Sequence, residues 1–159
     1  MAHISGPYAW SYNSFTLGVM NDAPRLRFSN SVDTIVGDNL GDTIQDGVFR
    51  GHNLYVDLIL NEFNAAAAQE AFWPYANTFG RIGQVGDRLL TYAKRLEATA
   101  IDPTIVVPTY LRMERAILAP GFEMSLLYGS RHRNVPLQLL CLPFVESGVT
   151  YLYNSIAVS

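Results

Sequence analysis

The chain has 159 residues, of which 49% are hydrophobic and only 16% charged, and its formal net charge is −3. This composition excludes a globally disordered chain, and the acidic balance argues against a general nucleic-acid binder, which is usually basic. A single domain of this size can bury its own core, and its scarcity of charge indicates that partners cover part of its surface.

The basic residues and the single cysteine narrow the class further. Ten of the eleven basic residues are Arg and one is Lys94, and Arg is the cation that interfaces favour. Cys141 alone excludes an internal disulfide framework and a cysteine-rich zinc site. The sequence shows no signal-peptide pattern and no apolar run of about 18 residues. We expect a soluble protein without a membrane partner, made in a reducing compartment.

The N-terminal segment, residues 1–12, is predicted to be an extended arm because it contains Gly6, Pro7 and closely spaced aromatic residues. Those aromatic residues are Tyr8, Trp10 and Tyr12. A short strand is predicted over Phe15–Met20, and Asn21–Pro24 has the chemistry of a turn.

From Arg25 onward the hydrophobic pattern has a period of two. Leu26, Phe28 and Val32 fall on one face of the predicted strand. The opposite face carries Arg25, Arg27, Ser29 and Asp33. This alternation predicts a half-buried strand, and Gly37–Gly41 is the turn that follows it.

Thr43–Asn61 is the most informative stretch of the chain. Its downstream half places four aliphatic residues on one face, namely Leu54, Val56, Leu58 and Leu60. Gly47 and Gly51 interrupt the upstream half, and glycine inside a strand marks a bulge, a bend or a close backbone approach. The pattern predicts a long, kinked strand or a pair of strands.

One short helix is predicted over about residues 64–73. Asn64 is a suitable N-terminal cap, the alanines that follow have the highest helix propensity, and Pro74 ends the helix. A helix of about ten residues is too short to be stable alone, so it must dock on a sheet.

The second half of the chain continues the β pattern. Strands are predicted over Asp87–Ala100 (where a helix is the alternative), Ile105–Leu118, Phe122–Tyr128 and Val135–Phe144, with turns or loops at Gly80–Gly86, Asp102–Pro103, Ala119–Gly121 and Gly129–Asn134. Val135–Phe144 is apolar on both faces, which predicts a strand buried on both sides.

These elements predict a mainly β fold: an antiparallel β-sandwich or partial barrel with one short flanking helix and extended N- and C-terminal arms. Residues 13–145 form the predicted sandwich domain, residues 1–12 the N-terminal arm and residues 146–159 the C-terminal tail.

The residues that carry chemistry in other proteins form no site that the sequence identifies. His3, His52 and His132 lie far apart in the chain and lack the spacing of metal ligands. The acidic residues of the glycine-rich region do not follow the calcium-loop pattern, and we interpret them as solvated turn carboxylates. They are Asp33, Asp38, Asp42 and Asp46.

Three further candidates have ordinary structural interpretations. Cys141 lies among leucines, so we interpret it as a buried hydrophobic residue rather than a nucleophile paired with His132. The glycines of Gly80–Gly86 lack the order and setting of a phosphate cradle. Arg131–Arg133 is a small basic turn that we interpret as a solvated hairpin tip. The alternative is that it contacts a phosphate or a carboxylate of a partner. We therefore predict no catalytic, cofactor-binding or metal-binding residues, no cofactor and no enzymatic activity.

The order of segments carries a family resemblance. Thr43–Asn61, with the sequence TIQDGVFRGHNLYVDLILN, is followed by an acidic residue, an alanine-rich helix and a glycine loop, and this order resembles the tail tube proteins of tailed bacteriophages. Three later stretches are similar to the strands and turns that follow in that family. They are Ala93–Glu97, Ala116–Gly121 and Arg133–Gln138, with a final strand near Leu142–Phe144.

The resemblance implies a β-sandwich flanked by one helix, with no catalytic residues to carry over. Six copies would form a ring whose long strands join into a barrel, and rings would stack into a tube through which DNA passes without sequence-specific binding. Thr43–Leu60 is the candidate for the strands lining the channel. We hypothesise that some of Asp38, Asp42, Asp46 and Asp57 face that channel, because an acidic wall does not retain DNA.

The same resemblance implies the partners and the location. The chain would be a self-assembling virion tail protein made in the bacterial host cytoplasm, with tail sheath, terminator and baseplate proteins as further candidate partners. The apolar segment Val135–Phe144 and the tail after it depart from the family. They leave other virion roles open, namely a capsid cement or decoration protein, a tail terminator or a neck protein. A small-ligand carrier with a sandwich fold and an enzyme are the remaining alternatives.

Overall fold

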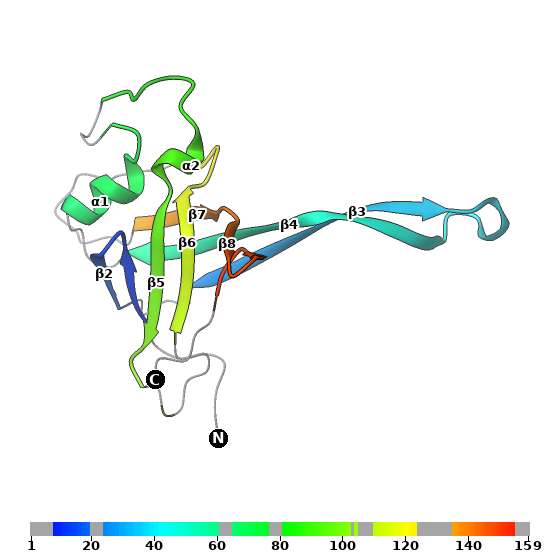
Figure 1. The fold of residues 1–159 in the computed structure, drawn as a ribbon, viewed down its shortest axis with the longest axis horizontal. Coiled ribbons are helices and arrows are strands. Elements are labelled where there is room, and N and C mark those ends of the chain that lie inside the picture. Colours follow the sequence, from blue (N-terminus) through cyan, green and yellow to red (C-terminus); the bar gives the residue numbers. More distant parts are fainter. Residues whose placement is uncertain are drawn as a thin grey trace.

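The structure is a computed structural model, and it describes residues 8–19, 24–60, 65–76, 81–102, 104, 110–123 and 135–154. Seven strands form one antiparallel sheet in the order β2-β1-β5-β6-β7-β4-β3, and β8 and β9 form a separate hairpin (Figure 1). The strands are β1 Tyr8–Tyr12, β2 Phe15–Val19, β3 Arg25–Val36, β4 Ile44–Leu60, β5 Lys94–Ala100, β6 Tyr110–Leu118, β7 Val135–Cys141, β8 Phe144–Glu146 and β9 Val149–Tyr151. The helices are α1 Ala65–Phe72 and α2 Leu89–Tyr92, with a 3-10 turn at Asp38–Leu40. The predicted mainly β antiparallel fold is confirmed.

One face of the sheet holds the hydrophobic core and is called the core face below. Directly paired residues of antiparallel strands share a face, and the buried pairs include Trp10 with Ala98 and Val56 with Leu139. Ala71 and Phe72 of α1 pack into the same cluster, so this short helix docks on the sheet as predicted. In Figure 1, β5 and β6 run across the direction of β7, β4 and β3, which shows how strongly the sheet coils toward a partial barrel.

The opposite face, called the outer face, is partly covered by the end of the chain. The Arg112 guanidinium lies over the Phe144 ring of β8, 5.8 Å from its centroid. Asn154 and Arg112 exchange two backbone hydrogen bonds of 2.8 Å. The segment 144–154 therefore folds back onto β6 rather than extending away as a tail, and residues 155–159 lie outside the described part.

The predicted N-terminal arm also differs from the structure. Tyr8–Tyr12 is strand β1, paired with β2 on one side and with β5 on the other. Its three aromatic side chains alternate into the core, and Tyr12 is fully buried with its hydroxyl donating to Ala116 O at 2.9 Å. A period of two in aromatic residues is a strand signal, and it outweighs the glycine and proline before it.

The long-strand prediction is confirmed, since β4 runs unbroken over Ile44–Leu60 with Leu54, Val56, Leu58 and Leu60 buried on the core face. Gly51 has φ 131°, and the pairing slips beside it so that Arg50 is an extra residue in β4. A Cβ on Gly47 would lie 2.6 Å from Val32 Cγ1, so the Val32 side chain approaches the backbone of β4 closely at this glycine. Both interruptions thus bend or crowd the strand without ending it.

Other boundaries shift by smaller amounts. Asp87–Ala100 divides into a helical turn, α2, and strand β5, so both interpretations of that segment hold over part of it. β7 ends at Cys141, and its outer-face residues Gln138 and Leu140 are half-buried rather than fully enclosed. The turn at Ala119–Gly121 is confirmed, with Phe122 N donating to Ala119 O at 3.1 Å. The predicted elements at residues 21–23, 105–109 and 124–134 fall outside the described residues.

Candidate assembly surface

The hairpin of β3 and β4 leaves the body of the protein and projects as a two-stranded ribbon (Figure 1). β7 pairs with β4 only over Leu54–Leu60, so residues 44–53 of β4 pair with β3 alone within the described residues. We call residues 29–53 the arm. All of the described side chains from residue 29 to 36 and from 39 to 50 are exposed.

The local sequence explains why the arm forms a hairpin. Both strands are rich in β-branched and aromatic residues, which favour extended backbone. Gly37 and Gly41 flank the tip, where Leu40 N donates to Gly37 O at 3.4 Å and Thr43 N donates to Leu40 O at 3.3 Å. Gly41 has φ 63°, a backbone region that glycine adopts without strain. The tip residues thus allow a tight connection between β3 and β4.

The register gives the arm one uncharged face. Val32 lies opposite Phe49, and Val36 lies opposite Ile44. Directly opposed residues share a face, and alternation along β3 places both pairs on the same side as Leu26 and its core-face neighbours. Within the two strands this side bears no charged residue; it consists of Asn30, Val32, Thr34, Val36, Ile44, Gly47, Phe49 and His52. We call it the uncharged face of the arm.

The other side of the same ribbon, called the charged face, carries the charged residues of the hairpin strands. Asp33 lies opposite Val48, and Ile35 lies opposite Asp46. Arg50, the extra residue of the bulge, forms an ion pair with Asp33. Two of the carboxylates proposed to face a channel, Asp46 and Asp57, thus share a side of the hairpin with each other.

Both proposed carboxylates have local partners. Asp46 Oδ1 accepts from Gly47 N at 2.7 Å. Near the base of the hairpin, Arg27 donates to Asp57 through Nε at 2.6 Å and through Nη2 at 3.2 Å. Asp42 is exposed at the tip, and the side chain of Asp38 lies outside the described part. The described charges of this face are therefore exposed to water or paired with a neighbouring group of the same hairpin.

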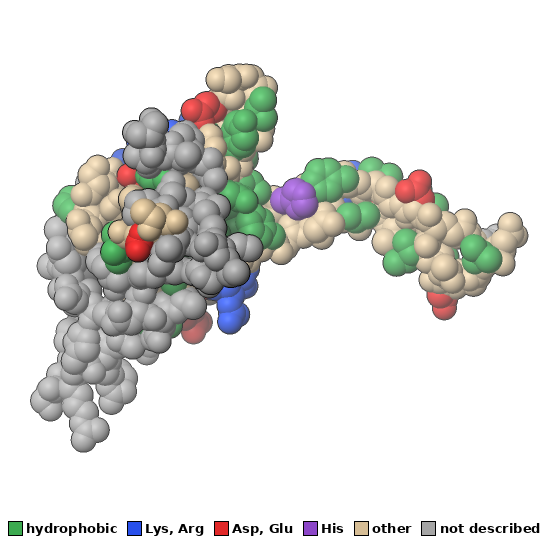
Figure 2. Space-filling view, turned by 90° about the horizontal axis from the view of Figure 1, so that it is seen from below, with side chains coloured by type: hydrophobic (Ala, Val, Ile, Leu, Met, Phe, Trp, Pro, Cys, Tyr) green, Lys and Arg blue, Asp and Glu red, His purple; other side chains and the backbone are tan. Residues whose placement is uncertain are grey.

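The exposed side chains of the uncharged face have an energetic cost. Val32, Val36, Ile44 and Phe49 are 40%, 49%, 63% and 60% exposed. Burying the exposed half of four side chains of this size is worth about 1 kcal/mol each, or about 4 kcal/mol together. A two-stranded ribbon is marginally stable in water by itself. Figure 2 shows hydrophobic side chains spaced along the whole arm, and an exposed surface of this kind indicates a contact site.

A second group of exposed apolar residues lies on the loop before α2, which Figure 1 shows on a different side of the body from the arm. Ile82 is 85% exposed and Val85 is 91% exposed, and Leu90 in α2 is 41% exposed. We call Ile82–Val85 the apolar loop; Asp87 and Arg88 lie between it and α2. Gly83 in this loop approaches Tyr75, since a Cβ there would lie 2.5 Å from Tyr75 O, so this glycine allows close packing. Gly80 lies outside the described residues.

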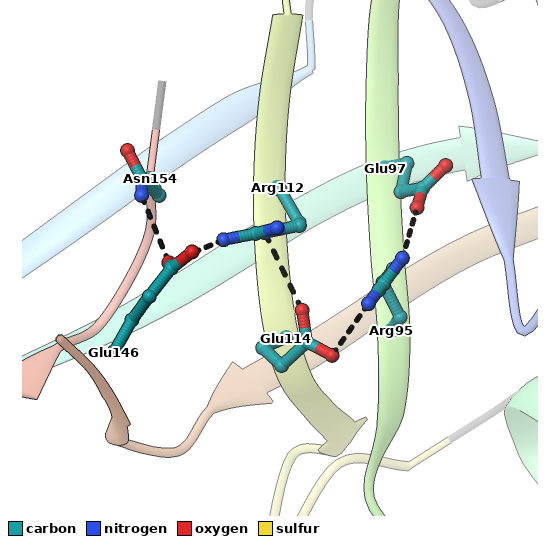
Figure 3. Close-up of polar contacts among 6 residues, drawn as sticks. All are labelled: Arg95, Glu97, Arg112, Glu114, Glu146 and Asn154. Carbon is teal, nitrogen blue, oxygen red and sulfur yellow. Dashed lines mark hydrogen bonds and ion pairs between the residues drawn. The ribbon is translucent and has the colours of Figure 1, made fainter. Parts of the chain in front are cut away.

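The outer face of the body carries a ladder of ion pairs (Figure 3). Arg95 joins Glu97 at 3.2 Å to Glu114 at 2.8 Å, and Arg112 joins Glu114 at 3.3 Å to Glu146 at 2.5 Å. Asn154 also donates to Glu146, at 3.1 Å. Because every charge in the ladder has an opposite neighbour, this face is held together internally and offers little net charge to a ligand.

The residues considered for catalysis or metal binding are not assembled into a site. Cys141 is buried, and burial raises the pKa of its thiol to about 12, which keeps it protonated and unreactive at neutral pH. His52 lies on the arm, with its ring 4.7 Å from the Phe49 ring. In the described ranges no three His, Cys, Asp or Glu side chains are grouped as metal ligands would be. His3, His132 and Arg131–Arg133 lie outside those ranges.

The sequence matches no family model, and no curated protein is similar to it. Among the residues described, no helix has the length and apolar character needed to cross a membrane. The pattern from Arg25 predicted a half-buried strand and Thr43–Asn61 predicted a long, kinked strand or a pair of strands, and neither pattern indicated that the two segments project as an arm. The signal that could have revealed it is the length of the alternation, because Arg25–Val36 and Ile44–Leu60 exceed the roughly five or six residues of an ordinary strand.

Proposed function

We propose that this chain is a structural subunit of a phage tail tube that assembles with copies of itself as stacked hexameric rings around a channel for DNA. The observation that carries the proposal is the arm, an exposed two-stranded ribbon with an uncharged apolar face. Such a ribbon gains stability only when other chains cover it. The resemblance of Thr43–Asn61 and its following helix to the tail tube proteins supports the choice among assemblies.

The edges of the arm support assembly with a second copy. β3 is the last strand of the sheet, and β4 has no described partner other than β3 over residues 44–53. These two edges belong to antiparallel strands, so the β3 edge of one arm can pair antiparallel with the β4 edge of the next. Pairing around a ring leaves no exposed edge, which is how closed barrels avoid aggregation.

Barrel geometry limits how such a ring is built. If six copies each contributed only the two strands of the arm, twelve strands spaced about 4.8 Å apart and tilted by about 40° would form a barrel roughly 24 Å across. Side chains reaching about 5 Å inward would leave about 14 Å, narrower than the roughly 20 Å width of a DNA duplex. A six-fold tube that conducts DNA therefore needs body strands in its wall as well.

The strands next to β4 in the sheet are β7 and β6. With these included, each copy contributes four strands, and a wall of twenty-four strands is about 48 Å across its backbone. In such a wall β3 of the next copy pairs with β6 instead of β4, at the edge of β6 that β5 occupies in the free chain. The proposal thus predicts a wall that continues from the arm into the body sheet, and an inner diameter in a density map tests it directly.

The experiment is negative-stain microscopy of the purified full chain, followed by measurement of the channel. Rings or tubes are expected. A matched variant replaces residues 32–50 with Asn-Gly, which joins the opposed residues Ser31 and Gly51 by a two-residue turn and keeps the paired base of the hairpin. This variant should fold and remain a monomer. A wild-type chain that is monomeric at high concentration would overturn the proposal.

The alternative is another virion structural role, namely a capsid cement or decoration protein, a tail terminator or a neck protein. The projecting arm favours this alternative, because one exposed ribbon can bind across neighbouring subunits of a different protein. Three-fold particles, or binding to capsids without rings or tubes, would support this alternative in the same micrographs.

A further inference from the structure

The two sides of the arm differ so sharply that they cannot serve the same purpose. The uncharged face continues the core face of the sheet, where Leu26 and Phe28 pair with Val56 and Leu54, outward beyond the body. The charged face continues the outer face, where Arg27 pairs with Asp57. Taking charges out of water has a desolvation cost even when they are paired, whereas burying an aliphatic side chain is favourable, so the uncharged face is better suited to a tight contact.

The apolar loop is the second exposed apolar group on the same chain. Ile82 and Val85 are more exposed than any hydrophobic side chain of the arm. No charged residue lies between them, since the intervening residues are Gly83 and Gln84. A contact between the arm of one copy and the loop of another would remove both apolar surfaces from water together.

We propose that the uncharged face of the arm docks on the apolar loop of a second copy of this chain, while the charged face stays in water. This inference rests on the proposed self-assembly and specifies its contact. The contact joins two different surfaces, so it is heterologous: each copy uses its arm on one neighbour and its loop on the other. A contact of this type builds rings or filaments and does not stop at a dimer.

The arm offers a matched pair of variants that differ only in the face they alter. Val36→Glu/Ile44→Glu places two charges on the uncharged face, at residues that are 49% and 63% exposed. Ile35→Glu/Val48→Glu places two charges on the charged face, at residues that are 49% and 53% exposed. All four positions are exposed in the free chain, so the body of the protein should tolerate either change, and circular dichroism checks this. In both variants each new Glu lies opposite another carboxylate, so the pairing of the arm is weakened in both and does not by itself predict a difference in assembly.

The measurement is sedimentation velocity at a concentration where the wild type assembles. Val36→Glu/Ile44→Glu should remain monomeric, Ile35→Glu/Val48→Glu should assemble as the wild type does, and a milder Val36→Ser/Ile44→Ser variant should assemble more weakly. The loop variant Ile82→Glu/Val85→Glu should also remain monomeric. Equal assembly of the two arm variants, or equal loss in both, would overturn the assignment of the faces.

Mixing two defective variants tests whether the two surfaces meet each other. The uncharged-face variant retains an intact loop, and the loop variant retains an intact arm, so a one-to-one mixture should form a heterodimer and nothing larger. A mixture that stays monomeric would overturn the loop as the docking site. If the wild type itself never assembles, the proposed function fails instead, and the two failures are distinguished.

Discussion

The ion-pair ladder on the outer face allows a stability prediction with an internal control. Arg112→Met removes a guanidinium whose side chain is only 15% exposed and which contacts Glu114, Glu146 and the Phe144 ring. Arg95→Met removes one that is 48% exposed and contacts Glu97 and Glu114. Methionine keeps most of the aliphatic stem, so each change mainly removes the charge.

The expected cost differs because the two sites differ in burial. Removing one partner of a fully buried pair costs about 3–5 kcal/mol, and an exposed pair contributes about 0–1 kcal/mol. Arg112 is mostly buried while its acidic partners are partly exposed, so we expect a loss of about 2 kcal/mol. For Arg95 we expect less than about 1 kcal/mol. In a chain of this size about 2 kcal/mol corresponds to a fall in Tm of roughly 4–8 °C.

The assay is urea unfolding followed by fluorescence, at low salt and at 1 M salt. The effect of Arg95→Met should shrink at high salt because exposed pairs are screened, whereas most of the Arg112→Met effect should remain. Limited proteolysis should cut the segment 144–154 faster in Arg112→Met alone, since that residue holds it to β6. If both variants lose the same free energy of unfolding, or if Arg112→Met loses none, the burial argument is refuted.

Three further predictions concern the core, the pH dependence and the arm. Leu139→Ala, at a fully buried core-face position, should lower the free energy of unfolding in urea by about 2–5 kcal/mol. Leu140→Ala, at the half-buried outer-face position next to it, should lower it clearly less. Equal losses of free energy in the two variants would contradict the assignment of faces. Burial raises the pKa of both Cys141 and Tyr12, so these groups lose their protons at lower pH in the unfolded chain than in the folded one. The free energy of unfolding should therefore be full below about pH 9 and fall above it. Cys141→Ser should reduce this alkaline loss in thermal unfolding measured as a function of pH, and an unchanged dependence of Tm on pH would contradict the prediction. In the monomeric Val36→Glu/Ile44→Glu variant, backbone amides of the arm should exchange with deuterium much faster than those of Leu54–Leu60. In wild-type assemblies the amides of the arm should become protected. Fast exchange in both states would show that the arm is not covered.

Local patterns in the sequence determined most, but not all, of the individual elements of this protein. The alternation of Leu54, Val56, Leu58 and Leu60 predicts the strand and its buried face, because side chains of a strand alternate whatever lies around them. The alanine-rich run before Pro74 predicts the short helix for an equally local reason. Burial of Cys141 follows from its leucine neighbours, since a run of apolar residues has to be shielded from water.

Only the tertiary structure decided where those elements are covered. Val32 and Phe49 have the same pattern as Val56 and Leu139, yet the first two are exposed on the arm and the last two are buried in the body. The difference is whether β7 lies alongside, and a pairing between strands about eighty residues apart leaves no trace in either local pattern. The place of Tyr8–Tyr12 between β2 and β5 also depends on a distant strand, although the alternation of its aromatic residues is a local strand signal.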